Sequence, residues 1–194
     1  MRKEAPYITY LSGRGVSERT VELYRMGYVD DGWLAGRVII PSFDRVGSIN
    51  FWSARSIFPN ETLRYRLPAN SKDVISNEHM VDWKKPVYLV EGIFDEIAIG
   101  PQAIALYGKF MPPRLALRLV EQRPPMIYVC LDADAREEAM KLMMRLVGYD
   151  LKCSLLDLAG KDPGDIGETG VVEAITRATV VTGSAGLITA RGIG

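Results

Sequence analysis

The chain has 194 residues, of which 47% are apolar and 25% are charged. This composition excludes an extended disordered protein and suits one large domain or two small ones. Two cysteines (Cys130 and Cys153) and one histidine (His79) are too few for a disulfide framework or a Cys/His zinc site, so we expect buried free thiols and no zinc in this chain. No segment has the apolar length of a signal peptide or a membrane span, so we expect a cytoplasmic protein without a membrane partner.

The formal net charge is zero, but the charged residues are unevenly distributed. Residues 1–85 contain 13 Lys and Arg against 10 Asp and Glu, whereas residues 86–194 contain 11 against 14. Between Arg37 and Lys72, six basic residues stand against two acidic ones. A basic surface and an acidic metal site cancel in the total, so the neutral net charge does not exclude a nucleic-acid partner.

The first part of the chain, residues 1–85, is expected to form a small mixed α+β subdomain. Residues 6–28 have a helical pattern, and Ser17 is placed to cap a helix within them. Two strand-like runs, RVIIPSF and SINFWSARSI, are joined by turn residues and predict an antiparallel hairpin. The polar run ETLRYRLPANSKD that follows predicts an exposed basic loop.

From Pro86 onward, apolar strands alternate with helices. The expected strands are VYLVEG, QAIALYG, MIYVCLDAD and KCSLLDL. One expected helix begins at Phe94. Three more cover PPRLALRLVEQ, EEAMKLMMRLVG and VVEAITRA. Uniformly apolar strands that alternate with helices indicate a parallel sheet covered on both faces. We therefore expect an α/β domain at residues 86–178, followed by a flexible Gly-rich tail at residues 179–194.

Acidic residues follow or close several of these strands. Glu91 ends the first strand, Asp132 and Asp134 end the third, and Asp162 and Asp165 lie in the loop after the fourth. The carboxyl ends of parallel strands meet at one edge of a sheet, where ligands bind. Mg²⁺ and Mn²⁺ prefer oxygen ligands, carboxylates above all. The sequence therefore predicts a divalent-metal site at this edge.

Helix capping is the alternative role for some of these acids. Asp134, Asp95 and Asp165 each precede a helical pattern, where a negative charge is favourable. Carboxylates that crowd together cost free energy unless a cation compensates them. The joint occurrence of Glu91 with the pair Asp132 and Asp134 therefore favours metal binding over capping.

The segments VYLVEGIFDEIAI, VCLDADAREEAMKLMMRL and LLDLAGKDPGDIG resemble the Toprim domain shared by bacterial-type primases, topoisomerases and some nucleases. Ahead of them, YLSGRGVSERTVELYRMGYV, GRVIIPSFDRVGSINFWSAR and RYRLPAN resemble the subdomain that precedes Toprim in DnaG-like primases, phage ones especially. The resemblance covers roughly residues 7–175. It implies a Toprim sheet flanked by helices and preceded by a smaller subdomain, and a place in the host cytoplasm if the protein is viral.

By motif position, the resemblance makes Glu91, Asp132 and Asp134 the catalytic and metal-binding carboxylates. It places Asp162 and Asp165 in an acidic loop that supports the metals. Two departures from the family pattern occur. Arg and Glu at positions 136 and 137 follow the DxD motif, where cellular primases usually have a small residue and a glycine. The DPGD loop leaves open which of its two aspartates is the closer ligand.

The resemblance also implies basic residues for template or nucleotide phosphates, at the positions of Arg37, Arg55 and Arg64. A primase would use Arg66 as a further phosphate contact and Tyr65 or Trp52 as a stacking surface, although packing is the more ordinary role of a buried aromatic residue. Lys109 follows the second expected strand at the acidic edge. A phosphate contact and a plain surface position are both open for it.

The implied function is DNA-dependent RNA primer synthesis, in which Mg²⁺ or Mn²⁺ assists nucleotidyl transfer from nucleoside triphosphates on a single-stranded DNA template. The zinc-binding module and the helicase-binding domain of such primases have no counterpart in these residues. We therefore expect a replicative helicase or a separate zinc-binding primase module as a partner. The alternatives are a Toprim-type nuclease and a non-catalytic nucleic-acid-binding replication subunit.

Overall fold

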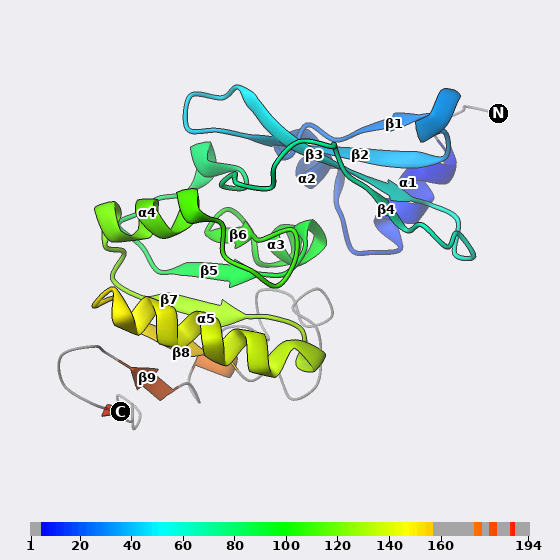
Figure 1. The fold of residues 1–194 in the computed structure, drawn as a ribbon. Helices are drawn as coiled ribbons and strands as arrows, with labels where there is room; N and C mark the ends of the chain where they lie inside the picture. The colour runs from blue at the N-terminus through cyan, green and yellow to red at the C-terminus, as the bar shows by residue number, and fades with distance from the viewer. Residues whose placement is uncertain (1–4, 157–172, 176–178, 182–186, 189–194) are drawn as a thin grey trace. The chain divides into compact units, whose positions relative to one another are not determined.

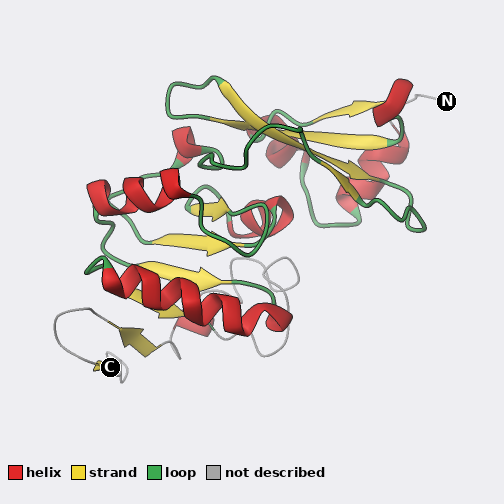
Figure 2. Cartoon of the chain, in the orientation of Figure 1, coloured by secondary structure: helices red, strands yellow, loops and turns green. Residues whose placement is uncertain are grey.

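The computed structural model describes residues 5–156, 173–175, 179–181 and 187–188. The chain divides into two compact units, Met1–Ser71 and Lys72–Gly194 (Figure 1). Each unit has its own sheet and its own helices (Figure 2). None of the described helices has the length and apolar character needed to cross a membrane.

The first unit is a four-stranded antiparallel sheet with two short helices. The helices are α1 (Ala5–Ser12) and α2 (Glu18–Leu23). The strands, in the order in which they pair, are β1 (Gly27–Val29), β2 (Arg37–Phe43), β3 (Ile49–Ser56) and β4 (Tyr65–Arg66). A 3-10 turn, η1 (Gly32–Leu34), lies between β1 and β2.

The expected hairpin in this unit is confirmed, because β2 and β3 pair antiparallel with Arg37 opposite Ser56. The expected helix cap is confirmed as well, since the Ser17 hydroxyl accepts a hydrogen bond from the Thr20 amide at 3.1 Å. The helical region ends earlier than expected, because Gly27 already begins β1. The loop that was expected to be exposed contains the short strand β4, which pairs antiparallel with β3. Across this pair, the Tyr65 ring stacks under the guanidinium of Arg55, its cross-strand partner.

The second unit is built on a six-stranded sheet in the order β10-β9-β8-β7-β5-β6. The strands are β5 (Val87–Val90), β6 (Ala103–Ala105), β7 (Ile127–Cys130), β8 (Cys153–Leu155), β9 (Thr179–Val181) and β10 (Leu187–Ile188). The helices are α3 (Ile93–Ile99), α4 (Pro113–Gln122) and α5 (Arg136–Gly148), with the 3-10 turns η2 (Glu78–Met80) and η3 (Ala133–Ala135).

The four strands β8, β7, β5 and β6 are parallel neighbours, which confirms the expected α/β fold. Apolar residues of β5 and β7 share one core with the inward faces of α4 and α5, and α5 lies across β7 and β8 (Figure 1). Leu89 of β5, Leu115 of α4 and Leu146 of α5 are fully buried in this core. On the other face of the sheet, Tyr88 and Tyr128 stack with ring centroids 5.2 Å apart.

The boundary between the units lies at Ser71, whereas the sequence placed it after residue 85. The intervening segment belongs to the second unit because Ile75 is buried in the core of that unit. Polar contacts add to this anchoring, since the Lys72 ammonium donates a hydrogen bond to the Tyr107 carbonyl at 2.7 Å. A polar run with one deeply buried isoleucine carries no periodic signal, so the sequence pattern missed it.

The tail expected from residue 179 contains two strands, β9 and β10. Strand β9 pairs antiparallel with β8, and β10 pairs antiparallel with β9. The β-branched run Thr-Val-Val that forms β9 favours an extended backbone, which the glycines around it obscured. Of the expected last helix, the structure describes residues 173–175 as helical.

A buried carboxylic acid, Glu96 of α3, ties the segment before β5 to the sheet. Its two oxygens accept hydrogen bonds from the Asn77 amide group at 2.7 Å and the Ala105 backbone amide at 2.9 Å. Burial raises the pKa of Glu96 to about 7, although hydrogen bonds from Ser76, Asn77 and Ala105 act in the opposite direction. The folded protein therefore binds a proton at Glu96 more tightly than the unfolded chain does.

This difference predicts a stability that falls with rising pH. The contribution is fully present below the ordinary pKa of 4.5 and is lost as the pH rises through about 7. We expect the free energy of unfolding to drop by roughly 3 kcal/mol across this window, and Glu96→Gln to flatten the drop. Denaturant titrations at a series of pH values measure the effect. Glu22→Gln, a change at an exposed acid, should keep the wild-type slope; an unchanged slope in Glu96→Gln would contradict the role of Glu96.

Candidate metal centre

Two neighbouring parallel strands bring the predicted carboxylates together. In the register of β5 with β7, Val90 lies opposite Cys130. Glu91 therefore follows β5 at the same edge where Asp132 follows β7. Ligand oxygens of Glu91, Asp132 and Asp134 all lie within 4.8 Å of one another.

The three carboxylates differ in exposure. Glu91 and Asp132 are half-buried, and each has one carboxylate oxygen shielded from solvent. Asp134 lies in the turn η3 and is exposed, with its side chain 79% accessible. Two sheltered oxygens beside an open one make a site that a cation can enter from solvent. An all-oxygen donor set of this kind fits Mg²⁺ or Mn²⁺, which keep water molecules and substrate oxygens among their ligands.

Lys109 places a cationic side chain at this site. Its ammonium forms an ion pair with Asp134 at 3.2 Å. The pKa of Lys109 is raised, first by its hydrogen bond to Asp134 and further by the charges of Asp134, Glu91 and Glu138. The expectation that Lys109 faces the acidic edge agrees with this placement. The described structure thus holds a positive charge where a metal or a phosphate would interact.

Of the three acids for which helix capping was the alternative role, Asp95 does cap a helix. The Asp95 carboxylate accepts a hydrogen bond from the Gly92 amide at 3.0 Å and so caps the start of α3. A Cβ atom at Gly92 would meet this carboxylate at 3.1 Å, so the glycine makes room for the cap. Asp134, in contrast, makes no capping hydrogen bond to α5, whose N-cap residue is Ala135.

Asp162 and Asp165, predicted to support the metals, lie outside the described residues. The two cysteines are described, and both are buried and free, as the sequence predicted. Burial raises the pKa of the Cys130 thiol and brings that of Cys153 to about 11. Both thiols are therefore protonated at neutral pH.

Of the predicted phosphate-binding arginines, Arg37 is placed inside the first unit. Only 3% of it is exposed, and its guanidinium donates hydrogen bonds to the backbone carbonyls of Leu63 at 2.9 Å and of Ala54 and Arg64 at 3.3 Å. Glu61 lies 3.8 Å away as an ion-pair partner. This arrangement favours a structural role for Arg37, which fixes the strand-to-strand connection that leads to β4.

The remaining arginines differ in how far they are committed to the fold. Arg55 donates a hydrogen bond from Nε to the Tyr10 hydroxyl at 2.9 Å and covers the Tyr65 ring at 4.6 Å. Arg64 is exposed. Arg66 is half-buried and lies over the ring of Trp33, 5.6 Å from its centroid.

Trp33 and Glu96 stand outside the motifs that the sequence displays. Trp33 is 65% exposed and contacts Trp52, with ring centroids 6.2 Å apart. The sequence gives little sign that Trp33 is exposed. It stands between Gly32 and an apolar pair, and most tryptophans are largely buried, so burial would be the ordinary expectation. Glu96 sits on the inward face of α3 next to the capping Asp95, so its burial could be read only from the helical phase.

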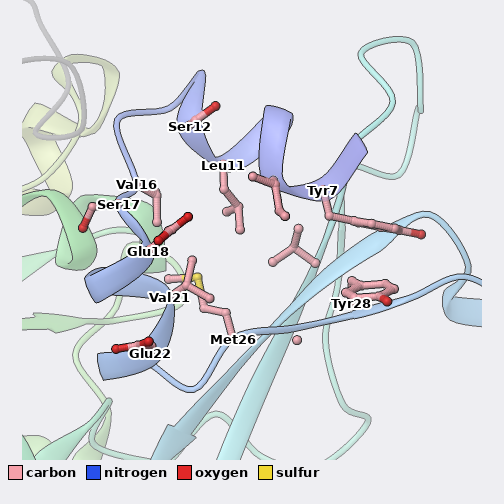
Figure 3. Close-up of a pocket in the computed structure, with 13 residues that line it drawn as sticks. Tyr7, Leu11, Ser12, Val16, Ser17, Glu18, Val21, Glu22, Met26 and Tyr28 are labelled. Atoms are coloured by element: carbon pink, nitrogen blue, oxygen red, sulfur yellow. The ribbon is translucent and has the colours of Figure 1, made fainter. Parts of the chain in front are cut away.

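A cavity of about 500 Å³ opens in the first unit between α1, α2 and β1 (Figure 3). Its lining is mostly apolar, with Tyr7 and Leu11 from α1 and Val21 from α2. Glu18 and Glu22 of α2 add negative charge to its lining. Nothing in this lining matches the phosphate chemistry suggested by the acidic edge.

Solved structures match this chain over nearly its whole length. The Aquifex aeolicus primase with its zinc-binding and RNA polymerase domains has a TM-score of 0.79 and 16% identity, over 93% of this chain and 57% of that chain. A DnaG primase catalytic domain bound to ssDNA has a TM-score of 0.79 and 16% identity, over 92% and 73%. The RNA polymerase domain of Mycobacterium tuberculosis primase DnaG has a TM-score of 0.73 and 18% identity, over 92% and 77%.

At these identities, the likeness shows the fold, and this chain has the fold of DnaG primase catalytic cores. The fold expected from the sequence motifs is thereby confirmed. The chain spans little more than half of the Aquifex primase chain that it matches. No family model matches the sequence, and no curated protein matches it.

The ion pair at the site predicts how Lys109 affects metal binding. Lys109→Ala removes a cation that competes for Asp134, so we expect Mn²⁺ to bind about two- to fivefold more tightly in the absence of nucleotide. Calorimetric titration with Mn²⁺ measures this. Lys85→Ala removes a lysine from a surface ion pair with Asp82 and serves as the matched control. Weaker or unchanged Mn²⁺ binding in Lys109→Ala would show that the lysine does not compete.

Proposed function

We propose that this chain is a primase catalytic core that synthesises RNA primers on single-stranded DNA by metal-assisted nucleotidyl transfer. The observation that carries the proposal is the convergence of Glu91, Asp132 and Asp134 at the carboxyl edge of β5 and β7. The DnaG-type fold of the chain supports the same function.

The roles of the site residues follow from their exposure. Glu91 and Asp132, which are half-buried, would bind the metal ion, and the exposed Asp134 would complete the set of ligands. When bound, Mg²⁺ or Mn²⁺ supplies positive charge that activates the attacking hydroxyl and stabilises the leaving pyrophosphate. Asp162 and Asp165 are proposed as additional supports for the metals.

Lys109 is proposed to contact the nucleotide. In the structure its ammonium forms an ion pair with Asp134 at 3.2 Å. If Asp134 served as a metal ligand, its pairing with Lys109 would weaken, and the ammonium would become available for a triphosphate oxygen. An ammonium is a compact point charge that suits a phosphate without fixing its geometry.

The template is proposed to lie along the basic surface of the first unit. Arg64 is exposed and Arg66 is half-buried, so both can reach phosphates, and Arg55 contributes from its place over Tyr65. Arg37 acts indirectly, since it holds the backbone at Leu63 and Arg64. Phosphate contacts of this kind position a strand without reading its sequence.

The Aquifex primase includes a zinc-binding domain, and this chain covers 57% of that chain. As partners we propose a replicative helicase or a zinc-binding primase module. Two other functions remain as alternatives. A Toprim nuclease would use the same carboxylates to cut phosphodiesters, and a non-catalytic subunit would keep the fold and bind nucleic acid only.

One assay separates these functions. The protein is incubated with single-stranded templates, labelled ribonucleotides and Mg²⁺ or Mn²⁺, with and without a zinc-binding primase module from a related system. We expect short labelled oligomers, and Asp132→Asn or Asp134→Asn should reduce them by about two orders of magnitude or more with the fold intact. Asp150→Asn, at an exposed acid of the same unit, is the control. Cut template without oligomers would indicate the nuclease, and normal synthesis by either site variant would rule out the metal assignment.

A second measurement tests the template contact. Arg64→Ala should weaken single-stranded DNA binding for all sequences alike and lower the slope of log affinity against log salt by about one. Fluorescence anisotropy of a labelled oligonucleotide at several salt concentrations gives both quantities. Arg19→Ala removes an exposed arginine of α2 in the same unit and should leave the slope unchanged. If Arg64→Ala keeps the full slope, Arg64 does not contact phosphate.

A further inference from the structure

A solvent-exposed tryptophan stands in the connection between β1 and β2. Trp33 belongs to the turn η1, and 65% of its surface is exposed. The connection is closed by a hydrogen bond from the Gly36 amide to the Val29 carbonyl at 2.8 Å and by one from the Ala35 amide to the Gly32 carbonyl at 3.1 Å. Gly36 has a φ of 71°, which only glycine adopts readily. The indole is therefore carried on a short, internally bonded turn.

Side chains of the sheet hold the indole in place. The ring of Trp52, from β3, meets it edge-on, with centroids 6.2 Å apart and an interplanar angle of 66°. The guanidinium of Arg66, from β4, lies 5.6 Å from its centroid. Arg66 pairs with Ala54 across the two strands, so Arg66 and Trp52 are diagonal neighbours on one sheet face. These contacts restrict the conformations of the exposed ring, and such restriction lowers the entropy cost of binding.

The surroundings of Trp33 carry a surplus of positive charge on one side. Arg64 is exposed beside β4, and Arg66 lies over the ring itself. The pKa of the buried Arg37 is lowered, first by burial and then by the charge of Arg66, while Glu61 opposes this. An anion near Arg66 would relieve this repulsion. Asp30 and Asp31 precede the turn, so an anionic chain is favoured on the side of Arg64 and Arg66.

We propose that Trp33 is a stacking platform for an unpaired base of single-stranded nucleic acid, with the adjacent phosphates directed toward Arg64 and Arg66. The proposal rests on the proposed function, because it names the part of the template-binding surface that takes a base. An indole face accepts any base, so the platform adds affinity without sequence preference.

The two aromatic residues that the sequence offered for stacking, Tyr65 and Trp52, are less suited to the role. Tyr65 is half-buried and therefore offers a base less of its ring than Trp33 does. Trp52 is half-buried and supports Trp33. A protein partner is the competing occupant for an exposed indole. The arginine over the ring favours the nucleic acid, because a phosphate can pair with the same guanidinium while the base stacks.

The test measures binding of labelled oligo(dT) by fluorescence anisotropy, with an abasic oligomer of the same length as the second probe. Trp33→Ala should weaken oligo(dT) binding at least about fivefold, and Trp33→Phe should recover most of the loss. Because stacking releases no counterion, Trp33→Ala should keep the wild-type salt slope, whereas Arg64→Ala lowers it. On the abasic oligomer, Trp33→Ala and the wild type should bind equally.

Tyr149→Ala is the matched control, since Tyr149 also lies under an arginine, with Arg145 at 5.9 Å from its ring centroid, but in the second unit. It should bind oligo(dT) like the wild type, and circular dichroism should show all variants folded. Equal oligo(dT) binding by Trp33→Ala and the wild type would overturn the platform and leave the primase proposal standing. An equal loss on both probes would also overturn it, because the effect would not depend on a base. A wild-type protein that binds neither probe would overturn both proposals.

Discussion

The parallel pairing of β5 with β7 is the constraint on which the candidate site depends. Glu91 and Asp132 are far apart along the chain, and only the register that sets Val90 opposite Cys130 brings them to one edge. Nothing local to either residue would do so. The core under this pairing, formed by both strands with α4 and α5, therefore helps to hold the carboxylates at this edge. A loss of packing at Leu89 or Val129 would displace the carboxylates without touching them.

Electrostatics complement this geometry. Three carboxylates within 4.8 Å repel one another, and the ion pair of Lys109 with Asp134 offsets part of that repulsion. The first unit shows the opposite situation, in which the charge of Arg66 adds to burial in lowering the pKa of Arg37. One unit thus attracts cations and the other attracts anions. This division accounts for a net charge of zero in a protein proposed to bind a polyanion.

How much of this could be predicted depended on how local the signal was. The apolar runs of β5 and β7, alternating with helices, predicted the parallel sheet and so the convergence of Glu91 with Asp132 and Asp134. The helix cap at Ser17 could be predicted because a serine just before a helical pattern is a local signal. The burial of Arg37 could not be predicted, because its partners are backbone carbonyls at Leu63 and Arg64, which no side-chain pattern reveals. The same holds for Ile75, whose burial depends on a core that is assembled from distant segments.

The segment from Lys72 to Met80 gives the second unit a covering layer that comes from outside the strand-helix repeat. If the protein were cut at Pro86, the place that composition suggests, the remainder would lose Ile75 from its core and Asn77 from the Glu96 carboxylate. An apolar opening and a buried acid with fewer donors would then meet water or a neighbouring molecule. A fragment that keeps the acidic edge together with these two contacts must therefore include Ile75 and Asn77. A gene fusion that moves the acidic edge into another protein would have to include the segment from Lys72 to Met80 as well.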